Sequence, residues 1–162
     1  MKKLTSPVAL HLVLVFGIIV TFILLIGTPM IVTAFFKSQY GLLDTSLVLS
    51  VSACIYICAT PYVIALFKLK KLSGLVVKNT PFSSESVTSL KMIAVCSFSE
   101  VILFITCVSS LKYSVEFFQY TVLGGPIIVV AFIGITIGLL CSVLAKLFEV
   151  AIEIKTENDQ TI

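Results

Sequence analysis

The sequence lacks arginine altogether and contains a single histidine, His11. Arginine is the residue that favours planar, bidentate recognition of phosphate groups, so we expect no direct nucleic-acid binding. A membrane serine protease would need a histidine within the bilayer, whereas His11 lies at the start of the first apolar run. The His-Glu-x-x-His motif of many metalloproteases is also absent. We therefore expect a protein that is not an enzyme and that uses no cofactor.

Charged residues are scarce as well, at 12% of the chain against roughly 25% in soluble domains. The hydrophobic fraction is 59% and the mean hydropathy is +1.17. The five cysteines lie inside apolar runs, and no Cys-x-x-Cys motif occurs. Such an odd set predicts neither a disulfide framework nor a zinc or other metal site. The composition is typical of a protein whose main partner is the lipid bilayer.

Four apolar runs are present, each longer than the roughly 18 residues that indicate a membrane helix. They predict spans at about residues 8–36, 45–67, 90–110 and 126–148. Short outer loops would join the first to the second span and the third to the fourth. We expect one all-α domain over residues 1–162, an integral membrane four-helix bundle that crosses the cell membrane as a multi-pass protein.

A basic connector, residues 68–89, joins the second and third predicted spans. Short lysine-rich loops stay in the cytoplasm, and the outer loops carry only Lys37 and Lys112. This bias predicts that both termini are cytoplasmic. Leucines alternate with the lysines at helical spacing, which favours an amphipathic helix at the membrane surface with a break at Gly74. The connector lysines that we assign to candidate contacts are Lys68, Lys70, Lys71 and Lys78.

Two local patterns predict how helices begin and pack. Ser83 is a candidate N-cap, with Phe82 and Val87 at the positions of a hydrophobic staple and Glu85 in the first turn. In the last span, small residues recur every four positions, which predicts a helix-packing face. These small residues are Gly134, Gly138 and Ser142.

Glu100 lies near the middle of the third predicted span. A carboxylate at membrane depth costs on the order of 2.5–3.5 kcal/mol, so it should face the other helices. Two interpretations remain open for this candidate polar site. Glu100 either joins helices through a hydrogen bond to a neighbouring Ser or Thr, or it serves as a proton, ion or ligand site.

The predicted cytoplasmic tail, residues 149–162, continues the helical pattern of the last span and carries half of the eight acidic residues. Like charges four residues apart on a helix repel each other, so we expect the acidic stripe to face something positive. That surface is either the basic connector of the same chain or a protein partner. The tail side chains assigned to these contacts are Glu149, Glu153, Glu157, Asn158 and Asp159.

The last twelve residues, Ala151 to Ile162, resemble the ending of a bacterial family of small four-span membrane proteins classed as a domain of unknown function. Members typically close with Glu-Leu-Lys-Glu-Glu-Asn-Asp-Leu-Thr-Ile, and the Asn-x-Pro-Phe-Ser turn at residues 79–83 is also similar. Thr156 and Gln160 depart from this ending, where the family has Glu and Leu. The resemblance implies no known activity. It does imply a partner, because the family's genes often lie beside those of small Cro/C1-type helix-turn-helix regulators.

Two functional hypotheses of different class follow. In the first, the protein is a regulatory or signalling module that binds a cytoplasmic protein, with a helix-turn-helix regulator as the candidate partner. In the second, it is a small transporter or immunity-type protein that works through Glu100 in a homo-oligomeric pore. A second charge within the membrane would favour transport, and none is present in the sequence.

Overall fold

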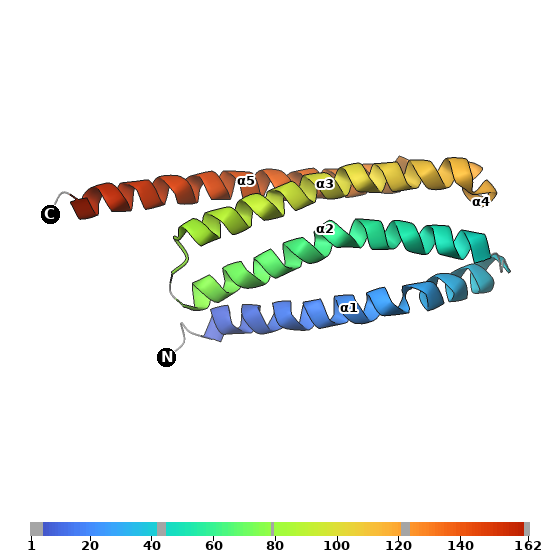
Figure 1. Ribbon diagram of the computed structural model, residues 1–162, viewed down its shortest axis with the longest axis horizontal. Helices are drawn as coiled ribbons and strands as arrows, with labels where there is room; N and C mark the ends of the chain where they lie inside the picture. Colours follow the sequence, from blue (N-terminus) through green and yellow to red (C-terminus); the bar gives the residue numbers. More distant parts are fainter. Residues whose placement is uncertain (1–4, 42–44, 79, 121–123, 161–162) are drawn as a thin grey trace.

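The computed structural model describes residues 5–41, 45–78, 80–120 and 124–160, and these contain helices and no strands. Four helices are long and apolar enough to cross a membrane, which confirms the predicted all-α, four-span architecture. In chain order the helices are α1 (Thr5–Tyr40), α2 (Thr45–Val77), α3 (Ser84–Ser114), the short α4 (Glu116–Gln119) and α5 (Gly124–Gln160) (Figure 1).

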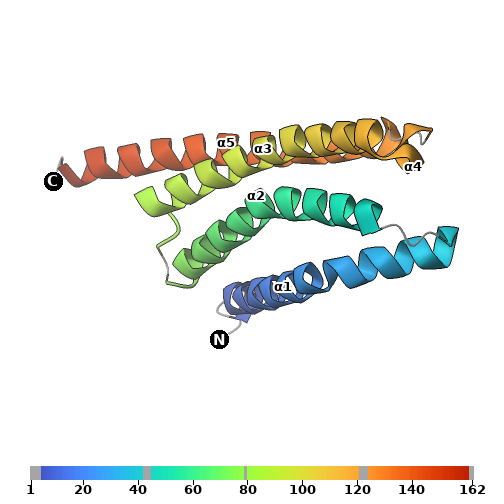
Figure 2. The ribbon, with the colours of Figure 1, turned by 45° about the vertical axis from the view of Figure 1, so that its right-hand side comes forward.

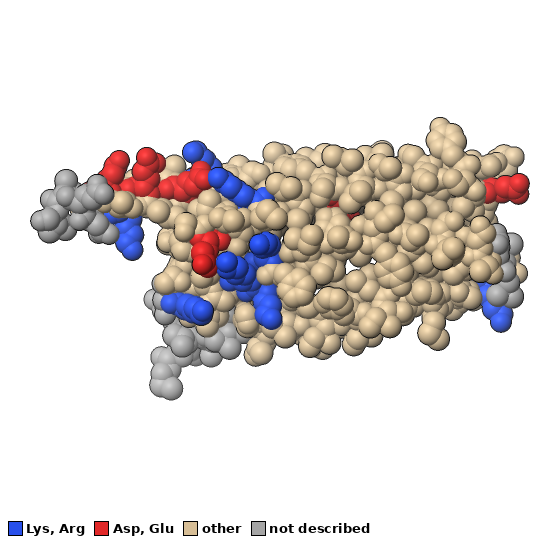
Figure 3. Space-filling view, in the orientation of Figure 1, with Lys and Arg blue, Asp and Glu red and all other residues tan. Residues whose placement is uncertain are grey.

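The four long helices lie side by side in the order α1, α2, α3, α5 (Figures 1 and 2). Each packs along the next, and among the described residues α1 packs along neither α3 nor α5. The bundle is therefore an open row with α2 and α3 at its centre. Thr5, Val77, Ser84 and Gln160 lie at one end of the row, which we call the lysine-rich end. Charged side chains gather mainly there, while the long middle of the molecule carries little charge (Figure 3). Glu100 lies near the middle of α3.

An aromatic cluster closes the opposite end of the molecule. Val32 and Phe36 of α1 and Leu47 of α2 are buried there, and Phe117 and Phe118 of α4 pack against them. The ring of Phe36 lies 5.4 Å from that of Phe117 in an edge-to-face arrangement. The segment expected to be an outer loop is thus partly helical. Apolar contacts with α1 and α2 explain why this turn is ordered.

The connector differs from its prediction, because α2 runs without a break through Gly74 to Val77. No separate surface helix is formed at this place. A glycine costs a helix only about 1 kcal/mol, and Leu72 packs against the core formed by Val87, Leu90 and Ala145. That packing outweighs the weak local preference. Figure 2 shows that α2 is curved, and its proline, Pro61, lies inside the helix.

The predicted start of α3 is confirmed. Ser83 has extended backbone angles (φ −133°, ψ 156°), and its Oγ accepts a hydrogen bond of 3.3 Å from the backbone N–H of Ser86. Glu85 lies in the first turn, where a negative charge favours the helix dipole. The ring of Phe82 packs on Phe148 of α5 at 4.9 Å. The residue before the cap therefore links the beginning of α3 to α5 as well.

The small-residue face of α5 packs against α3, although not through all the predicted residues. A Cβ added at Gly134 would lie 2.5 Å from Cγ2 of Val101, and one at Gly138 would lie 2.7 Å from Cζ of Phe98. Both glycines thus allow the close approach of the two helices. Ser142 is exposed and donates its hydroxyl to the carbonyl of Gly138. Ser142 does not pack against α3, because the contact face turns toward Ala145, which is only 1% exposed.

Candidate functional site

The tail of α5 extends beyond the rest of the bundle. At about 1.5 Å per residue a helix of this length spans about 55 Å, well above the roughly 30 Å of a bilayer core. Its C-terminal end projects past the start of α3 (Figure 1). Ile152 still packs against the core of Val87, Leu90 and Ala145, and the exposed residues 153–158 follow it.

Glu149 is held at the base of this tail by two lysines. Its Oε1 lies 2.5 Å from Nζ of Lys91 on α3, and its Oε2 lies 3.5 Å from Nζ of Lys146. Glu149 therefore does not contact the connector lysines, which are one of the two surfaces that the sequence left open for the acidic stripe. The reason is the order of the helices, since α5 packs along α3 and not along α2. Lys71 of the connector instead pairs with Glu85 at 3.3 Å.

Further along the tail the side chains are exposed. Glu153, Glu157 and Asn158 lie on the surface of the last helical turns, together with Lys155. The side chain of Asp159, which was also assigned to the contact set, lies outside the described part of the structure. Of the predicted acidic stripe, Glu149 is paired with α3, whereas Glu153 and Glu157 are exposed near the end of α5.

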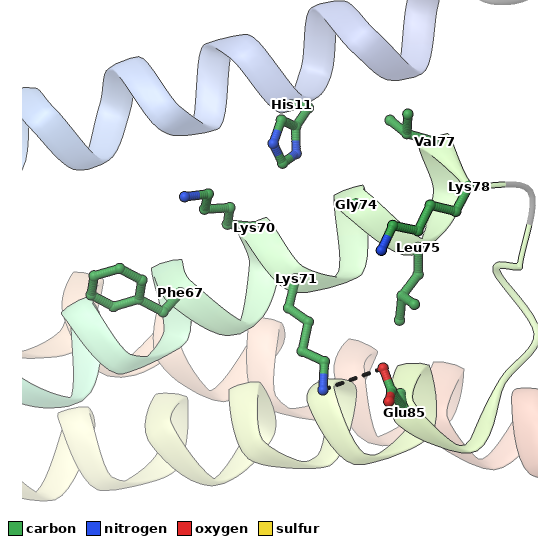
Figure 4. Close-up of a pocket in the computed structure, with 9 residues that line it drawn as sticks. All are labelled: His11, Phe67, Lys70, Lys71, Gly74, Leu75, Val77, Lys78 and Glu85. Carbon is green, nitrogen blue, oxygen red and sulfur yellow. Dashed lines mark ion pairs between the residues drawn. The ribbon is translucent and has the colours of Figure 1, made fainter.

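Three of the four connector lysines line a cavity at the lysine-rich end. It has a volume of about 520 Å³ and lies where α1, α2 and the start of α3 meet (Figure 4). Lys70 and Lys71 of α2 and Lys78 just beyond its end contribute to the walls. Glu85 lies on the α3 side. Lys68 is not among the lining residues. The structure thus brings the connector lysines to a concave site instead of to the acidic tail.

Glu100 lies in a groove of about 270 Å³ between α2, α3 and α5. The walls are mostly apolar and include Tyr62, Val130 and Ile133. Its Oε2 is shielded from solvent and has no hydrogen-bond partner among the described residues. Glu100 faces neighbouring helices as predicted, but the structure offers no Ser or Thr hydroxyl bonded to it. The helix-joining interpretation lacks its expected contact.

Three side chains at these sites were not assigned from the sequence. Lys91 pairs with Glu149 across 58 positions of the chain, and Glu85 pairs with Lys71. His11, at the start of the first apolar run, lines the cavity. No local pattern could reveal these pairings, because each joins two different helices. Among residues 5–41, 45–78, 80–120 and 124–160, no group of three His, Cys, Asp or Glu side chains is arranged to hold a metal.

Comparison with known proteins gives a family but no activity. The family described as "Protein of unknown function (DUF2975)" matches residues 4–162. The chain is also 32% identical over 111 residues to the "Uncharacterized membrane protein YoaS" of Bacillus subtilis (strain 168), an alignment that covers 67% of this chain and 68% of that protein. No solved structure matches. With nearly its whole length matched, and with a membrane protein among its relatives, the chain belongs to the DUF2975 family of membrane proteins of unknown function.

Proposed function

We propose that this protein is a membrane-anchored regulatory module that binds a cytoplasmic protein partner through the end of α5. The observation that carries the proposal is the projection of this charged helix beyond its neighbours (Figure 1). A helix that only crossed the bilayer would not need the tail of about 18 Å that residues after position 148 add. In this proposal both termini face the cytoplasm, as the lysine bias of the loops favours.

The tail is built as a recognition surface with a fixed base. Phe148 and Ile152 pack against the core of Val87, Leu90 and Ala145, and Lys91 of α3 pairs with Glu149. These contacts tie the base of the tail to α3. The exposed side chains of the turns that follow include Glu153, Lys155 and Glu157. Complementary charge steers association and selects partners. A small helix-turn-helix regulator, which the family resemblance implies, is the first candidate, and it would meet the tail through a basic surface.

The test is site-specific photo-crosslinking in native membranes. A photoreactive amino acid at Thr156, which is exposed, should crosslink a cytoplasmic protein that mass spectrometry can identify. The variant Glu153→Lys should lose the crosslink, because it reverses the charge of the surface. Glu116→Lys is the matched control, since Glu116 is exposed on α4 at the opposite end of the molecule. Equal crosslinking by wild type and Glu153→Lys would contradict the proposal.

One observation favours a second candidate function, a small transporter or immunity-type protein acting through Glu100 and a homo-oligomeric assembly. A carboxyl oxygen without a partner in an apolar groove is typical of a site that takes up a proton or ligand. Protein reconstituted in liposomes should then dissipate a pH gradient, reported by an internal dye, and Glu100→Gln should not. No flux through the wild-type protein would remove this candidate.

A further inference from the structure

The cavity at the lysine-rich end has the size and chemistry of a ligand site. Its volume of about 520 Å³ falls within the roughly 300–1,000 Å³ of small-molecule pockets. Lys70, Lys71 and Lys78 all reach it, and a single carboxylate, Glu85, belongs to its lining. Because Glu85 is paired with Lys71 at 3.3 Å, Lys70 and Lys78 leave an excess of positive charge for an anion.

His11 adds a polar atom that is poorly satisfied by the protein itself. Its Nδ1 is shielded from solvent and has no hydrogen-bond partner among the described residues. Figure 4 shows the ring pointing from α1 toward Gly74 of α2, with Lys70 and Lys78 on either side. The ring lies close to the backbone of α2 here, since a Cβ added at Gly74 would lie at an ordinary contact distance of 4.0 Å from Cε1 of His11. A buried polar atom without a partner favours a ligand that can bond to it.

The lining of the cavity also includes apolar side chains along its length. Lys78 lies just beyond the end of α2, at the surface of the molecule, whereas Phe67 lies about 15 Å deeper at 1.5 Å per residue. Leu75 and Val77 supply further apolar surface. Lysine side chains beside apolar ones match an amphiphile with an anionic head. Basic pockets between membrane helices bind lipid headgroups in this way.

We propose that this cavity binds a phosphate group, carried in the first place by an anionic glycerophospholipid. The phosphate lies between Lys70, Lys78 and His11, and the glycerol and the first acyl carbons lie against Phe67. A soluble phosphate has the same head chemistry and is the other source that the test separates. The cavity does not include the tail of α5, so this proposal holds whether or not a protein partner binds the tail.

The test is native mass spectrometry of the full chain in mild detergent with added phosphatidylglycerol, and with zwitterionic phosphatidylcholine in parallel. The double variant Lys70→Gln/Lys78→Gln should lower phosphatidylglycerol binding by about tenfold, because each lysine contributes to anionic-lipid affinity. Lys68→Gln/Lys155→Gln removes the same charge from two lysines that do not line the cavity. This control should bind phosphatidylglycerol as the wild type does.

A second variant blocks the cavity without changing its charge. Gly74→Leu extends a side chain toward His11 and should also reduce phosphatidylglycerol binding. Gly17→Leu is its control, because a Cβ at Gly17 would meet nothing within 4 Å. Circular dichroism and elution as a single species check that each variant folds.

Competition with inorganic phosphate identifies the source of the phosphate group. If both cavity variants lose phosphatidylglycerol binding, and added inorganic phosphate does not reduce the binding of this lipid to the wild type, the site is a lipid site. Binding of inorganic phosphate that both cavity variants weaken, without selective lipid binding, supports a site for a soluble phosphate. Equal losses in the cavity variants and their controls, or no loss in any variant, would overturn the proposal.

Discussion

At the scale of single residues, the contact between α3 and α5 depends on glycines that leave no room for a side chain. Gly134 is the tighter of the two, since an added Cβ would also lie 3.3 Å from the backbone oxygen of Ser97. Backbone cannot move aside as a side chain can. The spacing of Gly134 and Gly138 predicted this face correctly. The rotation of α5 about its own axis, which turns Ser142 away from α3, depends on packing and was not predictable from spacing.

Gly134→Leu should therefore destabilise the bundle by about 1–3 kcal/mol, the usual cost of inserting a side chain into a packed contact. SDS-induced unfolding in mixed micelles measures the change. Gly17→Leu, at an open position of α1, should leave the stability nearly unchanged because leucine favours a helix more than glycine does. Equal loss in both variants would mean that α5 does not pack on α3 through this face.

Glu100 gives the second prediction at this scale. Because Oε2 has no partner among the described residues, Glu100→Leu should stabilise the bundle by about 1–3 kcal/mol through removal of an unsatisfied buried group. Glu100→Gln keeps a polar group in the groove and should change the stability less. The same unfolding assay gives the comparison. A leucine variant less stable than the wild type would show instead that Glu100 joins helices, as one interpretation of the sequence held.

At the scale of elements, helix starts and spans were predictable because their causes are local. The four apolar runs lie within the four long helices, and the Ser83 cap follows from a pattern of a few residues. The continuity of α2 was not predictable, because Gly74 indicates a break unless the packing of Leu72 is known. The same reason explains the missed pair of Lys91 and Glu149, which depends on which helix lies beside α5.

The Ser83 cap supplies a prediction for this scale. Ser83→Ala removes the oxygen that accepts from the N–H of Ser86, and it should destabilise α3 by about 1 kcal/mol. Ser84→Ala is the matched control, because Ser84 is exposed at the first helical position. Hydrogen exchange of the amides in the first turn should rise in Ser83→Ala alone. Equal exchange in the two variants would contradict the role of the cap.

At the scale of the whole molecule, the row of helices gives the protein two chemically different ends. One has the aromatic cluster around Phe36 and α4. The other has the cavity lined by Lys70, Lys71 and Lys78, the Lys91–Glu149 pair and the projecting tail. The proposed partner and the proposed lipid site therefore lie at the same membrane surface. Which surface this is decides whether the tail can meet a cytoplasmic protein.

Cysteine accessibility in intact cells tests the orientation. In a background in which the five native cysteines are replaced by Ala, Tyr113→Cys should react with a membrane-impermeant maleimide, because Tyr113 is 86% exposed at the aromatic end. Thr80→Cys, exposed at the lysine-rich end, should react only after the membrane is permeabilised. The expectation follows from the lysine bias, which retains short basic segments in the cytoplasm.

Labelling of Thr80→Cys in intact cells, with Tyr113→Cys protected, would show that the protein has the opposite orientation in the membrane. The tail of α5 would then lie outside the cell and could not bind a cytoplasmic regulator, whereas the cavity could still bind an anionic lipid of the outer leaflet.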